Sequence, residues 1–226
     1  MTDGGDARTP ARSPAKDALV FMLAMGLSGL AGFVDAAGFV GLGGVFVSFM
    51  AGDGTRAAIK ATQDVAAALA LARLILVFVL GVVVGETVGA ATGRFGRVVV
   101  LAGEAALLWA AYAAVRAGAG DATVTSLLGF AMGAQNASVH HAEGIDVALT
   151  YVTGMVVHIG RGIARALRRE PGWRQIAPLS ALWAAVLVGS VAGGVVARHS
   201  IGDAVAVAAT VATAAVAASL VLLTER

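Results

Sequence analysis

The sequence predicts an all-α, polytopic membrane protein: a helical bundle of about six transmembrane helices, arranged as two inverted three-helix repeats with interrupted or re-entrant segments. Hydrophobic residues make up 58% of the 226 residues and charged residues only 13%, and the mean hydropathy is +0.85. A soluble domain of this length has no core large enough to hold so much apolar sequence. A polar pattern that occurs twice along the chain predicts the repeats.

Six apolar runs are long enough to cross a bilayer, because about 20 helical residues span its hydrocarbon core. They cover residues 21–40, 74–91, 98–115, 122–139, 176–197 and 203–223. Strands are not expected, since lipid-facing strands alternate in polarity and these runs do not. The polar residues 1–15 are expected to form a disordered cytoplasmic tail, which leaves 16–226 as a single transmembrane domain.

The basic residues predict the orientation. With the N-terminus inside, the cytoplasmic segments hold eleven of the sixteen Lys and Arg residues and the outer segments hold four. This excess favours cytoplasmic N- and C-termini. The first repeat, about 18–117, then starts inside, and the second, about 122–223, starts outside. The Gly-x-x-x-Gly motifs at 81–85 and 189–193 hold matching places in the two halves and would allow close helix packing.

In each copy of the polar pattern, an Asp or Asn near a helix end precedes a turn with a hydroxyl, an aromatic ring and a glycine. The residues concerned are Asp35, Ser48 and Gly52 in the first copy, and Gln135, Asn136, Thr150, Tyr151, Thr153 and Gly154 in the second. The segments 45–54 and 147–160 are too short to cross a membrane alone and are interpreted as re-entrant or interrupted helices. The alternative is that 147–166 forms a seventh span.

Three blocks in this order resemble the YoaK family of bacterial inner-membrane proteins of unknown function: GGVFVSFMAG at 43–52, GAQNA at 133–137 and TYVTG at 150–154. The resemblance extends from about residue 18 to 223. It implies a shared fold and a multi-pass location in the bacterial inner membrane, but no activity. The chain departs from the family pattern at Asp53 and at the pair 140–141, so these residues are not expected to carry a shared role.

Asp35 is the sharpest candidate for chemistry, since a carboxylate facing lipid would cost at least a few kcal/mol. It either binds a cation or proton, or caps the helix that follows it. Inverted repeats would bring Asn136 toward it, with Gln135 alongside; the alternative for these amides is an interhelical hydrogen bond of about 1 kcal/mol. The hydroxyls of the pattern either complete a cage for an ion or small solute or satisfy the broken backbone themselves.

Glu104, inside the third span, is a candidate for proton transfer or for an ion pair. Other chemistry is not expected. The chain has no cysteine, its histidines match no zinc spacing, and no nucleophile–base pair or nucleotide motif is visible. We therefore expect no enzyme activity, no cofactor and no metal. The net charge of +2 and basic residues beside the spans argue against nucleic acid.

The expected partners are the lipid bilayer and a small solute or cation, and homo-oligomerisation is left open. The leading hypothesis is a small-solute or ion transporter, or permease, with its site between the inverted repeats. The alternative is a non-transporting scaffold or sensor that binds helices, lipid or a partner protein. A sealed core would favour the scaffold, whereas a solvent-reachable cavity between the repeats would count against it.

Overall fold

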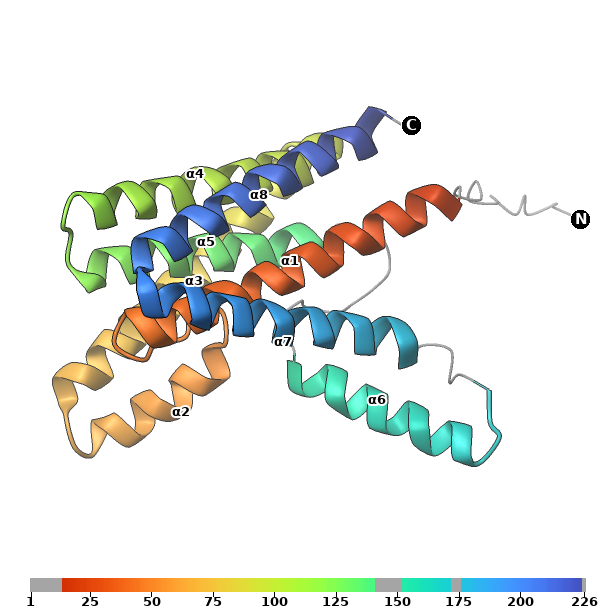
Figure 1. Cartoon of the computed structure of the whole chain (residues 1–226), viewed down its shortest axis with the longest axis horizontal. Helices are drawn as coiled ribbons and strands as arrows, with labels where there is room; N and C mark the ends of the chain where they lie inside the picture. The colour runs from red at the N-terminus through yellow and green to blue at the C-terminus, as the bar shows by residue number, and fades with distance from the viewer. Residues whose placement is uncertain (1–13, 141–151, 172–175, 225–226) are drawn as a thin grey trace, which may run out of the picture.

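The computed structural model describes residues 14–140, 152–171 and 176–224, which are helical with short turns and contain no strand (Figure 1). The helices are α1 (Pro14–Gly41), α2 (Met50–Ala61), α3 (Val65–Ala91), α4 (Gly96–Arg116), α5 (Asp121–His140), α6 (Val152–Leu167), α7 (Ile176–His199) and α8 (Ile201–Thr224). Five of them, α1, α3, α4, α7 and α8, are long and apolar enough to cross a membrane. The chain is therefore a multi-pass helical membrane protein.

Helix α5 coincides with the expected span at 122–139 but is not among those five. It carries Thr125, Gln135, Asn136 and Ser138, and all four are buried. These polar side chains are tolerated because α5 packs against α3, α4 and α1, and so faces protein along much of its length. Hydropathy alone therefore does not identify α5, and its role as a sixth span stays a prediction.

The start of α1 and the length of α6 bear on two predictions, the N-terminal tail and the seventh span. Helix α1 begins at Pro14, so the last two residues of the expected tail are helical. Proline suits a first helical turn because it has no N–H to satisfy there. Helix α6 has only 16 residues, about 24 Å of helix, which is shorter than a hydrocarbon core. The first residues of the 147–166 range lie outside the described part of the chain.

The chain breaks its helical path between α1 and α2 and folds back along α1. Gly43 and Gly44 have φ values of +75° and +78°, a backbone conformation that glycine adopts without strain. The returning loop reaches Asp35, which lies six residues, or about 9 Å of helix, before the end of α1. Helix α2 then packs against α3. The expected segment 45–54 thus comprises this loop and the first turn of α2.

Helices α1 and α7 cross with their backbones in contact. A Cβ atom at Gly189 would collide with the carbonyl oxygen of Gly29, and one at Gly193 with that of Phe33. From the other side, a Cβ at Gly32 would meet the carbonyl oxygen of Val186. Only glycine allows this approach, as in other small-residue contacts between membrane helices.

Helices α3 and α5 cross in the same way. A Cβ at Gly81 would collide with the carbonyl oxygen of Phe130, and one at Gly85 would lie 3.0 Å from Ala134 backbone atoms. A Cβ at Gly133 would meet the carbonyl oxygen of Phe78. Both Gly-x-x-x-Gly motifs noted in the sequence therefore lie at helix crossings.

The remaining contacts join the two crossed pairs into one bundle. Helix α4 packs on α8 and α5, and α1 also packs on α8; Figure 1 shows α4 and α8 side by side. Two buried apolar clusters fill the interior. One includes Leu30, Val34, Leu108, Leu128 and Met132, and the other consists of Leu23, Leu27, Leu101 and Leu222.

Candidate functional site

Asp35 binds the returning loop through its carboxylate. The backbone N–H groups of Val47 and Ser48 donate to Oδ1 at 2.8 and 2.7 Å, and the Ser48 hydroxyl donates to Oδ2 at 2.6 Å. The N–H of Phe49 makes a longer contact with Oδ1 at 3.4 Å. Val47 and Ser48 belong to the loop before α2, and α2 itself has no side-chain cap hydrogen bond. Asp35 therefore anchors the loop that leads into α2, and the expected cap of the helix is not what its hydrogen bonds form.

A second acidic residue, Asp53, holds the same loop from the other side. Its side chain is fully buried, accepts the Phe46 N–H at 3.1 Å and pairs with Arg56 at 3.1 Å. Arg56 also donates to the Gly44 carbonyl and lies 5.9 Å from the centre of the Phe39 ring. The sequence reasoning did not assign Asp53 or Arg56 a role, although their i, i+3 spacing is a signal for an ion pair.

The loop also borders an open groove beside Asp35. The groove has a volume of about 410 Å³ and lies between α1, the loop and α7, with Asp35 and Ser190 as its polar lining residues. Phe39, Phe46 and Phe49 contribute aromatic surface, and their rings stack or meet edge to face. Gly52 lies behind this cluster, where a Cβ would come within 2.6 Å of the Phe49 ring. The loop geometry therefore joins Ser48 to Asp35 and places Gly52 against the aromatic cluster.

Glu104 is the most isolated charged group in the described bundle. Its side chain is 0% exposed, and neither carboxylate oxygen has a hydrogen-bond partner among the described residues. It lies on the buried stripe of α4, between Leu101 of one apolar cluster and Leu108 of the other. The ion pair expected as one role of Glu104 is not found there. A buried carboxylate without a partner carries a desolvation penalty of several kcal/mol.

Two more polar side chains lie near the junction of the apolar clusters. Gln135, 1% exposed, donates its amide to the Leu27 carbonyl of α1 at 2.8 Å. Its Oε1 atom and the hydroxyl of the adjacent α1 residue Ser28 are buried without partners in the described chain. Ser28, Glu104 and Gln135 share a buried oxygen without a partner among the described residues, and we refer to these three residues as the buried polar layer.

The second copy of the polar pattern is only partly described. Asn136 donates to the Met132 carbonyl of its own helix at 2.9 Å, and its predicted approach to Asp35 stays a prediction. Thr153 is exposed and Gly154 is buried in the first turn of α6. Thr150 and Tyr151 lie outside the described residues. Among the described residues, no group of three side chains is arranged to bind a metal ion.

The helices and the polar groups between them define a class: a multi-pass α-helical membrane protein with buried polar residues. The chain matches the family described as "Protein of unknown function (DUF1275)" over residues 23–219. It is also 39% identical, over 185 residues, to "UPF0700 transmembrane protein RA0705" of Rhizobium meliloti (strain 1021), covering 80% of this chain and 77% of that protein. No solved structure was found to match.

The chain therefore belongs to the DUF1275 family of membrane proteins. The printed name of the Rhizobium protein agrees with the five apolar helices seen here. The narrower resemblance to the YoaK family stays a prediction, because neither match carries that name.

Proposed function

We propose that this protein is a small-solute or ion transporter of the bacterial inner membrane, built from two inverted repeats, in which Glu104 binds a proton or cation. The observation that carries the proposal is the buried carboxyl group of Glu104, which has no partner among the described residues. Ionisable groups inside membrane bundles commonly belong to ion pathways or proton relays.

The matching helix crossings support the inverted repeats. The first span of each half crosses the second span of the other half: α1 crosses α7, and α5 crosses α3. Equivalent glycines make both crossings, with Gly81 and Gly85 on α3 and Gly189 and Gly193 on α7. An odd number of spans in each half, three, would give the halves opposite orientations in the membrane.

The buried polar layer offers the chemistry that a coupling site needs. Glu104 supplies a negative charge, and the Gln135 Oε1 atom supplies a neutral oxygen that lacks a donor in the described structure. The carboxylate, the amide oxygen and the Ser28 hydroxyl oxygen are the kinds of ligand that a proton or a small cation takes. Because α4, which carries Glu104, packs on α5 and α8, this layer would lie at the centre of the bundle.

Asp35 has a different role in this proposal. Its oxygens already accept four hydrogen bonds from residues 47–49, so the carboxylate positions the loop rather than binding the coupling ion. The groove beside it lies between α1 of one half and α7 of the other. This position, between the proposed repeats, is where a solute site is expected in transporters of this design.

The test is transport by the purified protein in liposomes. Currents on a solid-supported membrane are recorded after concentration jumps of H⁺, Na⁺, K⁺ and a panel of small organic solutes. We expect the wild type to give a current with at least one of these, and Glu104→Gln to abolish it. Glu86→Gln is the matched control, because Glu86 is a half-buried carboxyl on α3, outside the polar layer, and its loss should leave the current unchanged.

Two results would contradict the proposal: an unchanged current in Glu104→Gln, or no current from wild-type protein with any of the ions and solutes. The second result would favour the scaffold or sensor. A specific observation already supports that alternative, since the hydrogen bonds of Asp35 are satisfied within the protein. The scaffold or sensor would be identified if a Glu104→Gln variant that lacks transport activity still bound a partner protein.

A further inference from the structure

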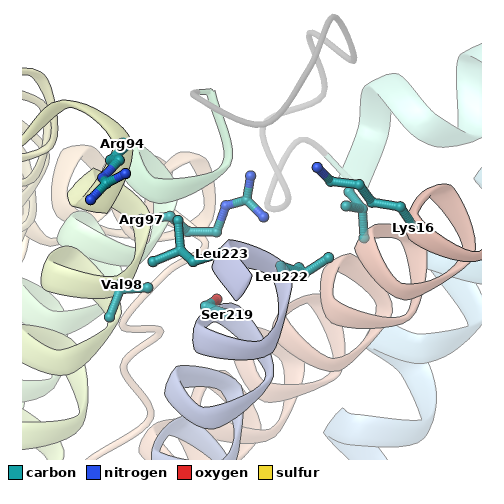
Figure 2. Close-up of a pocket in the computed structure, with 8 residues that line it drawn as sticks. Lys16, Arg94, Arg97, Val98, Ser219, Leu222 and Leu223 are labelled. Atoms are coloured by element: carbon teal, nitrogen blue, oxygen red, sulfur yellow. The ribbon is translucent and has the colours of Figure 1, made fainter. Parts of the chain in front are cut away.

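A small pocket lies at the end of the bundle where α1 begins and α8 ends (Figure 2). Three cationic residues line it from separate elements: Lys16 at the start of α1, Arg94 in the turn Gly93–Phe95, and Arg97 in the first turn of α4. Figure 2 shows Arg97 and Lys16 on opposite sides of the pocket, above the end of α8. None of the described lining residues is acidic.

A neutral donor lies at the base of the same pocket. Ser219 of α8 is 2% exposed, and its hydroxyl has no hydrogen-bond partner among the described residues. An unsatisfied buried hydroxyl destabilises the folded protein, so a ligand oxygen that accepts from it would be bound favourably. The N-terminus of α4, which has no side-chain cap, adds a partial positive charge beside it.

From these groups we infer that the pocket binds a phosphate-bearing anion. Guanidinium groups, an ammonium group, a hydroxyl and a helix N-terminus are the donors that recognise phosphate oxygens. The space is small, about 30 Å³, so it would admit only part of the anion, and the rest of the group would lie at the mouth near the three cations.

The surroundings favour a lipid headgroup over a free anion. The pocket is bordered by Val20, Val98, Leu222 and Leu223, which could contact the first methylenes of acyl chains. The orientation predicted from Lys and Arg puts this end of the bundle at the cytoplasmic leaflet, where anionic lipids are found and where basic pockets between helices bind their headgroups.

The experiment titrates the full-length protein, in a non-ionic detergent, with three probes: short-chain phosphatidylglycerol, short-chain phosphatidylcholine and inorganic phosphate. Binding is read from the rise in Tm, because a ligand that binds only the folded state stabilises it by mass action. We expect phosphatidylglycerol to bind. Each cation removed, in Arg97→Gln and Lys16→Gln, should weaken its apparent affinity about fivefold, the effect of one basic residue near anionic lipid.

Arg116→Gln is the matched control, because Arg116 lies at the opposite end of α4 and should not change the affinity. Ser219→Ala should weaken binding without altering charge. If Arg97→Gln does not fold, Arg94→Gln replaces it, since the Arg94 side chain is exposed. Binding of inorganic phosphate with the same dependence on Arg97 would support a free phosphate anion as ligand. Equal binding of phosphatidylcholine, or wild-type affinity in both arginine variants, would overturn the inference.

Discussion

At the scale of single residues, Asp35 shows how backbone N–H groups and one hydroxyl can satisfy a carboxylate inside a membrane helix. The N–H groups of the returning loop converge on it at distances from 2.7 to 3.4 Å. Each hydrogen bond to a charged group contributes more than one between neutral partners. The hydrogen bonds make Asp35 an anchor for the loop before α2 rather than a cap of that helix, and its role as an ion site stays a prediction.

Replacing Asp35 tests directly how much its hydrogen bonds to the loop stabilise the fold. Asp35→Ala leaves the loop N–H groups without an acceptor, and we expect the free energy of unfolding to fall by about 3 kcal/mol. Asp35→Asn keeps one carbonyl oxygen for those groups and should lose less than half of that. The measurement is thermal unfolding in detergent, with Asp17→Ala at an exposed position as control. An equal decrease in the free energy of unfolding in Asp35→Ala and Asp17→Ala would contradict a stabilising contact between Asp35 and the loop.

Replacing Glu104 is expected to raise thermal stability, in contrast to replacing Asp35. Glu104→Gln preserves the shape of the side chain but removes the ionisable group, and with it the penalty of burying a charge that has no described partner. We therefore expect Glu104→Gln to raise the Tm in the same detergent assay. Lower thermal stability in this variant would show that Glu104 makes a favourable interaction in the folded protein, and the proposed coupling role would lose its basis.

The hydroxyl–aromatic–glycine turn singled out Ser48 and Gly52 in the sequence. The structure shows that the Ser48 hydroxyl donates to Asp35, whereas the roles expected for both residues at a solute or ion site stay predictions. Asp53 and Arg56 were missed because, on a short helix, an i, i+3 acid–base pair is typical of a solvated face as well as of a buried anchor. The isolation of Glu104 could not be predicted, since it depends on which residues three other helices bring near it.

At the scale of helices, the sequence located each long apolar segment, because hydrophobic length is a strong signal, but it placed the starts of α1 and α3 seven and nine residues too late. The two Gly-x-x-x-Gly motifs correctly marked four contact glycines among the 30 in the chain, but the sequence did not mark the contact glycines Gly32 and Gly133. Gly193 and Gly194 are neighbours, yet a Cβ at Gly193 would collide with the Phe33 carbonyl, whereas a Cβ at Gly194 would meet nothing within 4 Å. Only the helix crossing decides which glycine matters.

This pair of neighbours provides a matched test of the α1–α7 crossing. Gly193→Ala should force the helices apart and lower the free energy of unfolding by about 1–3 kcal/mol, the range for overpacked sites. Gly194→Ala adds the same methyl group in open space and should raise stability by about 0.5–1 kcal/mol, because alanine is the better helix former. Chemical denaturation of the two variants measures both effects. Similar values for the two would contradict the crossing described here.

At the scale of the whole molecule, the ends of the helices fall into two groups. The pocket that contains Lys16, Arg94 and Leu223 joins the start of α1, the α3–α4 turn and the end of α8. A separate pocket joins Arg116, His199 and Asp203, from the end of α4 and the α7–α8 turn. Both described chain ends thus lie on one side of the bundle. This agrees with the even number of spans that the sequence predicts, although α5 lacks the hydropathy of the other five.

The inverted topology can be tested by labelling, because the chain has no native cysteine. Single cysteines are introduced at exposed turn positions: Gln63 and Gly120 for the predicted outer face, and Arg94 and Glu170 for the predicted cytoplasmic face. A membrane-impermeant maleimide applied to intact cells should label the first two positions, and the other two only after permeabilisation. The positions 63 and 120 precede α3 and α5, which cross each other side by side. Labelling of only one of them in intact cells would exclude the arrangement in which α3 and α5 both run inward from the outer face, and with it the inverted repeat.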